Sequence, residues 1–373
     1  MREATSRPPS TGGQGDFVAT HRMRIGVASL ACPAAPFVLA WAILPSPLPT
    51  VHAVVVHHRG EALLSRCLES LLASRSVDLQ VAVVANACQE PLPPVTEGDR
   101  RVHVLRSAAP LGFAAASNRG VAFLGERAGL PDHLYFVNDD TVGDPGALRE
   151  LTDHLGRDPR CAIAGPRLVI DGTGRLNSLG LNVTRDGEAW DAGIGRRLDA
   201  RSAPGGPRAV LAVTGSALLV RRDVLDSLGG WEEIYGWYYE DVDLCLRARA
   251  AGWNVAAVPA ATVRHALSAT ARDPEIKLYH MFRNRLLLLA VHWPAGLLLA
   301  SAPRLLSSEC WRFAVRLSRG ARVEARSQLR AWGGFLHLLP AALARRRRRG
   351  PRRDWVLLLS PPGSVPPIRL GLS

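Results

Sequence analysis

The stretch YFVNDDTVGDPGAL, residues Tyr135–Leu148, ends an apolar run with three consecutive polar residues. The run has the β-favouring composition of a buried strand, and it stops at Asn138, Asp139 and Asp140. Asn and Asp are common turn residues, so this pattern is typical of a strand that simply ends. Oxygen ligands spaced in this way can also share a divalent cation. The stretch therefore predicts a strand end and leaves its chemistry open.

Upstream of this stretch, apolar strands alternate with amphipathic helices. The expected elements are a strand at 52–58, a helix at 61–74, strands at 78–86 and 101–107, a loop and helix at 111–129, and a strand at 133–141. This order predicts an α/β fold with a mostly parallel, Rossmann-like sheet and helices on both faces. Ligands of such sheets bind beyond the carboxyl ends of the strands, here His57-His58, Asn86 and the 138–140 triplet. No GxGxxG follows the first strand, so the dinucleotide-binding fingerprint is absent.

The second half of the chain is less regular. We expect strands at 161–170 and 209–222, and between them the glycine-rich stretch 186–207 is predicted to be a mobile loop over a site. A helix over 240–252 ends at Gly252. A strand and loop follow it and carry His265.

Three acids, Glu240, Asp241 and Asp243, lie at the start of that helix. The helix dipole favours negative charge there by about 0.3–1 kcal/mol each. Asp243 and Arg247 are four residues apart and are expected to pair, which gives one acid a structural role. Three acids exceed what helix capping requires. The aromatic residues at 237–239 that precede them are typical of a sugar-binding site, although a packed core edge has the same pattern.

The composition of the 373-residue chain favours a globular protein with one strongly basic region. The net charge is +13, and lysine occurs only at Lys277, so arginine supplies almost all of the positive charge. The excess is concentrated in the run ARRRRRGPRRDW, residues Ala344–Trp355. Its neighbours are apolar and lack interleaved aromatic and basic residues, so an anionic membrane is a better partner for it than nucleic acid.

The six cysteines form no CxxC and no Cys/His metal spacing, which suits a reducing cytoplasm better than a disulfide framework.

Both ends of the chain are predicted to lie outside the main domain. Residues 1–22 have a disordered composition, and Ile25–Pro47 is an apolar stretch interrupted by Pro33 and Pro36. We interpret that stretch as a membrane-associated or dispensable extension; a signal peptide and a start site further downstream are the alternatives. Beyond residue 283, an apolar stretch broken at Trp293-Pro294 predicts an interfacial helix pair rather than a clean transmembrane helix.

Four sequence blocks, taken in order, resemble the family 2 inverting glycosyltransferases of the GT-A fold. They are LGFAAASNRG, YFVNDDTVGDPGAL, GGWEEIYGWYYEDVDLCLRARAAGW and VRHALSAT, and MFRNRLLLLAVHWP resembles the block that follows the catalytic core in that family. The bacterial rhamnosyltransferase-like and galactofuranosyltransferase-like members are most similar. We therefore expect an N-terminal extension at 1–50 and a GT-A catalytic domain at 51–283. The domain would have a nucleotide-binding half at 51–141 and an acceptor-binding half at 142–283. A helical, membrane-associating and polybasic extension would follow at 284–373.

The resemblance implies roles for the matching residues. Asp241 corresponds to the general base that deprotonates an acceptor hydroxyl, and Glu240 would orient the acceptor or the base. Metal ligands would be Asn138, Asp140 and His265, holding Mn²⁺ or Mg²⁺. The residues expected to bind the donor are His58, Asn86, Gly112, Asn118, Asp139 and Gly215. Those expected to bind the acceptor are Trp231, Trp237 and Tyr238.

One position departs from the family pattern. Family members usually end the second strand with an acid that holds the donor's base or ribose, and this sequence has Ala85 there. Asn86, or Glu90 from a shifted loop, is a candidate substitute.

The resemblance implies an enzyme that moves rhamnose or a similar sugar from a dTDP- or UDP-sugar. The acceptor would be a lipid-linked or cell-surface glycan, in cell-wall or polysaccharide biosynthesis, at the cytoplasmic side of the inner membrane. No nucleic acid partner is expected. The alternatives are a nucleotidyltransferase, which also uses paired acids and a metal, and a degenerate GT-A domain that only binds its partners.

Overall fold

The computed structural model describes residues 47–198, 205–267, 274–346, 354–362 and 364. These residues all belong to one compact unit that begins at Pro47. The predictions for the N-terminal extension, and for most of the arginine run, lie outside the described residues.

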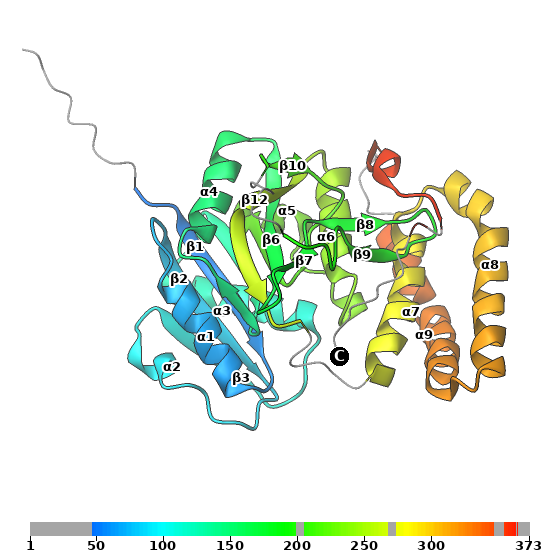
Figure 1. Ribbon diagram of the computed structural model, residues 1–373, viewed down its shortest axis with the longest axis horizontal. Coiled ribbons are helices and arrows are strands. Elements are labelled where there is room, and N and C mark those ends of the chain that lie inside the picture. The colour runs from blue at the N-terminus through cyan, green and yellow to red at the C-terminus, as the bar shows by residue number, and fades with distance from the viewer. Residues whose placement is uncertain (1–46, 199–204, 268–273, 347–353, 363, 365–373) are drawn as a thin grey trace, which may run out of the picture. The chain divides into compact units, whose positions relative to one another are not determined.

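The core of this unit is a sheet with the strand order β10-β12-β6-β11-β4-β1-β2-β3 (Figure 1). The strands on this path are β1 (Thr50–His57), β2 (Asp78–Asn86), β3 (Val102–Ser107), β4 (His133–Asn138), β6 (Cys161–Ile170), β10 (Arg208–Ala209), β11 (Ala217–Arg221) and β12 (Asn254–His265). Strands β1 to β4 are mutually parallel, and β12 is parallel to β6. Strand β11 is antiparallel to β4 and β6. The prediction of a mostly parallel sheet is confirmed.

Helices cover both faces of the sheet, because alternate strand residues point to opposite sides. Val51, Ala53 and Val55 of β1 belong to the core on the side of α1 (Glu61–Leu72) and α4 (Ala147–Arg157). Val54 belongs to the core on the other side, with α3 (Phe113–Ala128) and α6 (Glu240–Ala250). At Gly120 of α3 an added Cβ would lie 2.6 Å from Val54 Cγ1, so a glycine is needed for α3 to lie this close to the sheet. The short helices are α2 (Val95–Gly98), α5 (Arg222–Leu228), η1 (Glu233–Tyr235) and η2 (Asp354–Leu358).

Two predictions in the second half need correction. The expected strand at 209–222 is β10 and β11 separated by a loop through Gly215, since only Ala217–Arg221 pairs with β4. The expected mobile loop at 186–207 instead contains β9 (Ala189–Asp191), which pairs with β8 (Leu181–Val183). The remaining strands are β5 (Thr141–Gly143), which pairs with β12, and β7 (Arg175–Ser178), which pairs with β6.

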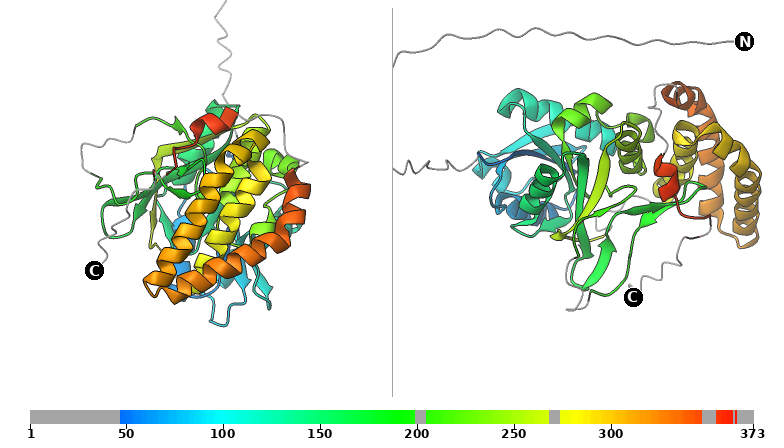
Figure 2. Two further views of the ribbon diagram at one scale, coloured as in Figure 1. Left: turned by 90° about the vertical axis from the view of Figure 1, so that its right-hand side faces the viewer. Right: turned by 90° about the horizontal axis from the view of Figure 1, so that it is seen from above.

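Three long helices follow the sheet. They are α7 (Pro274–His292), α8 (Ala295–Ser318) and α9 (Arg322–Arg346), and the break between the first two falls at Trp293-Pro294 as predicted. Figure 2 shows them together at one side of the unit, coloured yellow to dark orange. Helix α7 shares the core of α3 and α6 through its run Leu287–Val291. No helix in the described part of the chain has the length and hydropathy needed to span a bilayer.

A buried ionic group joins α6 to α7. Asp243 is 0% exposed and accepts hydrogen bonds from Arg247 Nε at 2.7 Å, from His292 Nε2 at 2.7 Å and from the Tyr235 hydroxyl at 3.3 Å. The predicted pair of Asp243 with Arg247 is confirmed, and His292 extends it to the next helix. Asp243 therefore has a structural role.

Replacing Asp243 by Asn should lower the free energy of unfolding by about 3–5 kcal/mol, because it leaves the Arg247 guanidinium buried without its counter-ion. The measurement is urea denaturation. The control Asp153→Asn removes only exposed pairs with Arg149 and Arg157 and should cost less than about 1 kcal/mol. Equal losses in the two variants would contradict the role assigned to Asp243.

Candidate active site

A cavity of about 380 Å³ opens at the carboxyl ends of β1, β2 and β4. It brings together most of the predicted site residues. Those lining it are His58, Asn86, Asn138, Asp139, Asp140, Gly215, Trp237, Tyr238, Glu240, Asp241 and His265. Segments more than 200 residues apart in sequence thus meet at one site.

Three predicted substrate-binding residues do not line the cavity. Trp231 is 2% exposed, and its ring packs edge-on against Phe113 and Phe136, with centroids 5.4 and 4.9 Å away. Asn118 bonds the backbone N–H and C=O of Trp231, so its amide holds a turn. These two side chains support the site from the core.

Gly112 supports the loop that carries the aromatic lining. An added Cβ at Gly112 would lie 2.6 Å from the carbonyl oxygen of Gly236, so only glycine permits this backbone approach. Its role in the structure is the packing of that loop rather than contact with the cavity.

The pairing of β5 with β12 brings Asp140 next to His265. Thr141 lies opposite His265 in the ladder, and the Ala266 N–H donates to the Asp140 carbonyl at 2.9 Å. As a result Asp140 Oδ1 lies 3.1 Å from His265 Nε2. His265 Nδ1 donates to Asn177 Oδ1 at 2.7 Å, which leaves Nε2 with its lone pair directed at the site.

These groups fit a divalent cation. Two ligands about 2.1 Å from a metal and at right angles are about 3 Å apart, which matches the pair of Asp140 and His265. Asp140 Oδ1 is buried and has no hydrogen-bond donor among the described residues. The Asn138 amide nitrogen donates to Ser216 Oγ at 3.4 Å, so its oxygen is available to a cation.

Asp139, expected to bind the donor, is held by His57, to which the sequence assigned no role beyond its place at a strand end. His57, which is 0% exposed, donates from Nδ1 to Asp139 Oδ2 at 2.7 Å. Burial raises the pKa of Asp139, and the hydrogen bond from His57 opposes that shift. The only sequence signal for this contact is the position of His57 at the end of β1.

Asp241, the predicted base, has its carboxylate at the cavity. Its Oδ2 accepts from the Gly215 N–H at 2.9 Å, and its Oδ1 accepts from the Val242 N–H at 2.8 Å. Burial raises the pKa of Asp241, and these two backbone hydrogen bonds lower it. The carboxylate is thus fixed at the cavity by bonds to both oxygens.

Glu240 differs from its neighbour. Burial and the nearby charge of Asp241 raise its pKa well above its ordinary value, and its Oε2 is buried with no hydrogen-bond partner among the described residues. Both effects favour the protonated form of Glu240.

The aromatic lining is held in a strained conformation by α7. Tyr238 and Tyr239 have φ angles of 67° and 74°, a region costly for residues other than glycine. The buried amide nitrogen of Asn284 lies 2.7–2.8 Å from the carbonyl oxygens of Tyr235, Trp237 and Tyr238. Asn284, which belongs to the block MFRNRLLLLAVHWP, therefore fixes the conformation of this loop.

The cavity has further lining residues that were not predicted. They include Asn177, Ala189, Trp190, Asp191, Thr214, Ser216, Tyr239, Lys277 and Met281. Burial raises the pKa of Asp191 to about 6. Lys277 carried a sequence signal as the only lysine of the chain, whereas Asp191 lay within the stretch interpreted as a loop.

Ala85 is buried in β2, and both of its suggested substitutes bind the protein's own backbone. Asn86 donates to the Leu111 carbonyl and accepts from the Leu111 N–H, at 2.9 and 2.7 Å. Glu90 accepts from the Gly60 N–H at 2.7 Å. Each of the two side chains is thus held in place by backbone hydrogen bonds.

The described residues contain one further group of potential metal ligands. His154, Asp158 and Cys161 lie with their ligand atoms within 4.8 Å of one another, at the end of α4 and away from the cavity.

Comparison with known proteins relates this cavity to an activity. Residues 49–285 match the model of the family described as glycosyltransferase like family 2. The N-acetylglucosaminyl-diphospho-decaprenol L-rhamnosyltransferase of Mycobacterium tuberculosis is 32% identical over 251 residues, which covers 61% of this chain and 80% of that protein. The pre-mycofactocin glycosyltransferase of the same organism is 31% identical over 173 residues, 46% of this chain and 34% of that protein.

A solved structure has the same fold at low identity. The crystal structure of GalNAc-T7 with UDP, GalNAc and Mn²⁺ matches with a TM-score of 0.52 and 16% identity, over 65% of this chain and 49% of that chain. The expected GT-A architecture is thereby confirmed. The family model covers well over half of the sequence, so the chain belongs to glycosyltransferase like family 2 and is a glycosyltransferase.

Proposed function

We propose that this glycosyltransferase moves rhamnose or a similar sugar from a dTDP- or UDP-sugar to a hydroxyl of a lipid-linked glycan, with inversion at the anomeric carbon. The observation that carries the proposal is Asp241, a half-buried carboxylate at the cavity with both oxygens fixed by backbone N–H groups. The relative named as an N-acetylglucosaminyl-diphospho-decaprenol L-rhamnosyltransferase supports the choice of sugar and of acceptor.

In the proposed reaction Asp241 takes the proton of the acceptor hydroxyl as its oxygen attacks the anomeric carbon. One bond from carbon to the acceptor oxygen forms while the bond to the diphosphate oxygen breaks, so no covalent enzyme intermediate is needed. A protonated Glu240 would limit the negative charge beside the base and would donate its O–H to the acceptor. Trp237 and Tyr238 would contact the acceptor sugar from the strained loop.

Asn138, Asp140 and His265 would hold a divalent cation, Mn²⁺ or Mg²⁺. Such an ion, when bound, stabilises the negative charge of a diphosphate leaving group. Asp139, His58, Asn86 and Gly215 would contact the donor from the strand ends and the β10–β11 loop.

The lipid part of the acceptor would meet the three long helices. Helices α8 and α9 expose large apolar side chains, among them Leu299, Leu306, Trp311 and Leu336 at 64–76% exposure. An apolar cavity of about 700 Å³ lies between α7, α8 and α9. These two helices contain eight arginines and only two acids, Glu309 and Glu324. This combination favours an anionic membrane surface, and we place the protein at the cytoplasmic side of the inner membrane.

We also propose the domain division given above, with the GT-A domain at 51–283 split into donor-side and acceptor-side halves at residue 141. The C-terminal extension at 284–373 would attach it to the membrane.

Replacing Asp241 by Asn should lower sugar transfer by about 10²–10⁴-fold, because the acceptor hydroxyl loses its base. Donor binding should persist, since it uses other residues. Because burial raises the pKa of Asp241 and the base must be ionised, wild-type kcat/KM should fall with decreasing pH at values above the ordinary Asp pKa of about 4. Transfer is measured as UDP or dTDP release over a panel of nucleotide sugars. Undiminished transfer by the variant would contradict the assignment of the base, and no release by the wild type would favour a binding module.

Asp140→Asn and His265→Ala should each weaken Mn²⁺ binding by about tenfold or more, because each removes one ligand of the proposed site. Isothermal titration calorimetry with Mn²⁺ alone measures this without turnover. The matched control is His154→Ala, which alters the group at the end of α4 and should leave the main binding event unchanged. Loss of binding in the control alone would move the cation to that group.

Leu299→Ser with Trp311→Ser should reduce binding to vesicles containing anionic lipid, because both exposed side chains would enter the lipid interface. Cosedimentation with vesicles of phosphatidylglycerol and phosphatidylcholine measures the effect. Leu130→Ser removes a side chain of similar exposure, 73%, from the loop after α3 and is the control. Equal binding by both variants would exclude this helix surface as the membrane contact.

A further inference from the structure

The β8–β9 hairpin brings an additional carboxylate into the cavity. Leu181 of β8 lies opposite Asp191 of β9 in the ladder, and both line the cavity together with Ala189. Ala189 and Asp191 are two residues apart, so they share one face of the strand. The cavity face of this hairpin is therefore apolar except for Asp191.

The Asp191 carboxylate is incompletely satisfied by the protein. The polar side chains of Ser178 and Asn177 lower the pKa of Asp191, against a larger rise from burial. Its Oδ1 is nevertheless buried with no hydrogen-bond partner in the described part of the chain. An unsatisfied buried acceptor is costly, and a ligand that brings an O–H donor relieves that cost.

A cation is not the ligand that Asp191 best fits. Asp191 lines the same cavity as the proposed base Asp241 and the proposed metal ligand His265. Among the described residues, however, it forms no group with Asp140 and His265 whose ligand atoms fall within 4.8 Å. The remaining kind of ligand for Asp191 is a hydroxyl group that donates a hydrogen bond near Asp241. The acceptor sugar supplies several such hydroxyl groups.

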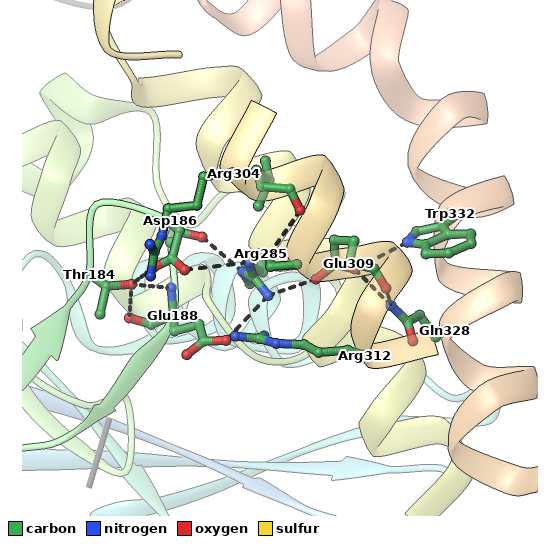
Figure 3. A network of polar contacts seen from close by, with 12 residues as sticks. Thr184, Asp186, Glu188, Arg285, Arg304, Glu309, Arg312, Gln328 and Trp332 are labelled. Carbon is green, nitrogen blue, oxygen red and sulfur yellow. Dashed lines mark hydrogen bonds and ion pairs between the residues drawn. The ribbon is translucent and has the colours of Figure 1, made fainter. Parts of the chain in front are cut away.

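The turn of the hairpin is clamped by the long helices, as Figure 3 shows. Arg285 of α7 donates from Nε to the Asp186 carbonyl at 2.8 Å and from a terminal nitrogen to Glu188 at 3.4 Å. The same terminal nitrogen donates to Glu309 of α8 at 3.0 Å, and Arg312 of α8 also pairs with Glu188. Charged groups of two helices therefore converge on the residues that precede β9.

Two aromatic residues hold the same turn through its backbone. Trp293 donates from its indole N–H to the Arg185 carbonyl at 2.8 Å, and the Tyr239 hydroxyl donates to the Gly187 carbonyl at 3.1 Å. The position of Asp191 is thus fixed before any substrate binds, as a binding residue requires.

We propose that Asp191 accepts a hydrogen bond from a hydroxyl of the acceptor sugar next to the one that Asp241 deprotonates. This inference rests on the proposed function, because it concerns the acceptor of that reaction. Asp241 and Asp191 then hold one sugar ring at two positions, and the second contact selects acceptors with a hydroxyl at the neighbouring carbon.

The test compares Asp191→Ala and Asp191→Asn with the wild type, using N-acetylglucosaminyl-diphospho-farnesol as acceptor. Asp191→Ala should raise the acceptor KM by about tenfold or more, since hydrogen bonds to charged groups are strong. Asp191→Asn should have an intermediate effect, because its amide oxygen still accepts. Donor hydrolysis without acceptor, and Mn²⁺ affinity by calorimetry, should stay unchanged in both variants. The control Asn182→Ala alters β8 of the same hairpin at a residue that does not itself line the cavity.

Failure of the Asp191 contact and failure of the proposed function give different results. An unchanged acceptor KM in Asp191→Ala overturns it. Weakened Mn²⁺ binding also overturns it, because Asp191 would then act through Asn177 on His265. If the wild type releases no nucleotide from any donor, that result contradicts the proposed function itself, and the inference about Asp191 with it. An acceptor analogue that lacks the neighbouring hydroxyl should bind the wild type and Asp191→Ala equally, and a remaining difference would count against the contact.

Discussion

The site depends on one short antiparallel pairing, that of β5 with the end of β12. Because Thr141 lies opposite His265, the polar end of β4 is joined to a residue more than 120 positions later in the chain. The ladder fixes Asp140 and His265 to within 3.1 Å of one another, and neither residue needs a ligand to reach that position. The parallel strands then add Asn86 and Asn138 at the same edge of the sheet. A slip of one residue in this ladder would turn His265 to the opposite face.

The first turn of α6 shows how environment divides the roles of similar residues. Asp243 faces the core and is neutralised by Arg247 and His292. Asp241, two residues earlier, faces the cavity and is held by backbone N–H groups. Glu240 is buried, and its Oε2 has no hydrogen-bond partner among the described residues, so its pKa is raised. One turn of helix thus contains an ion pair, a candidate base and a buried acid whose pKa is raised.

The sequence predicted what is encoded locally. Strand and helix periodicity indicated the parallel sheet, and the polar residues at strand ends marked its functional edge. The pairing of Asp243 with Arg247 followed from helix spacing. Trp231 and Asn118 were misplaced because an aromatic residue and an amide look alike in a sequence whether they face substrate or support a turn. Asp191 was missed because its exposure to the cavity depends on a hairpin whose turn is fixed by Arg285, about 95 residues away along the chain. The carbonyl groups bound by Asn284 were likewise undetectable without the tertiary fold.

Asn284 holds the carbonyl groups of Tyr235, Trp237 and Tyr238, and this contact affects the order in which the parts of the molecule fold. Every strand of the sheet and α6 precede residue 284, so they leave the ribosome before it does. Until α7 docks, the loop with Tyr238 and Tyr239 lacks the donor that offsets its backbone strain. The aromatic wall of the cavity is therefore among the last parts to take shape, and a nascent chain can have a folded sheet before it has a working site.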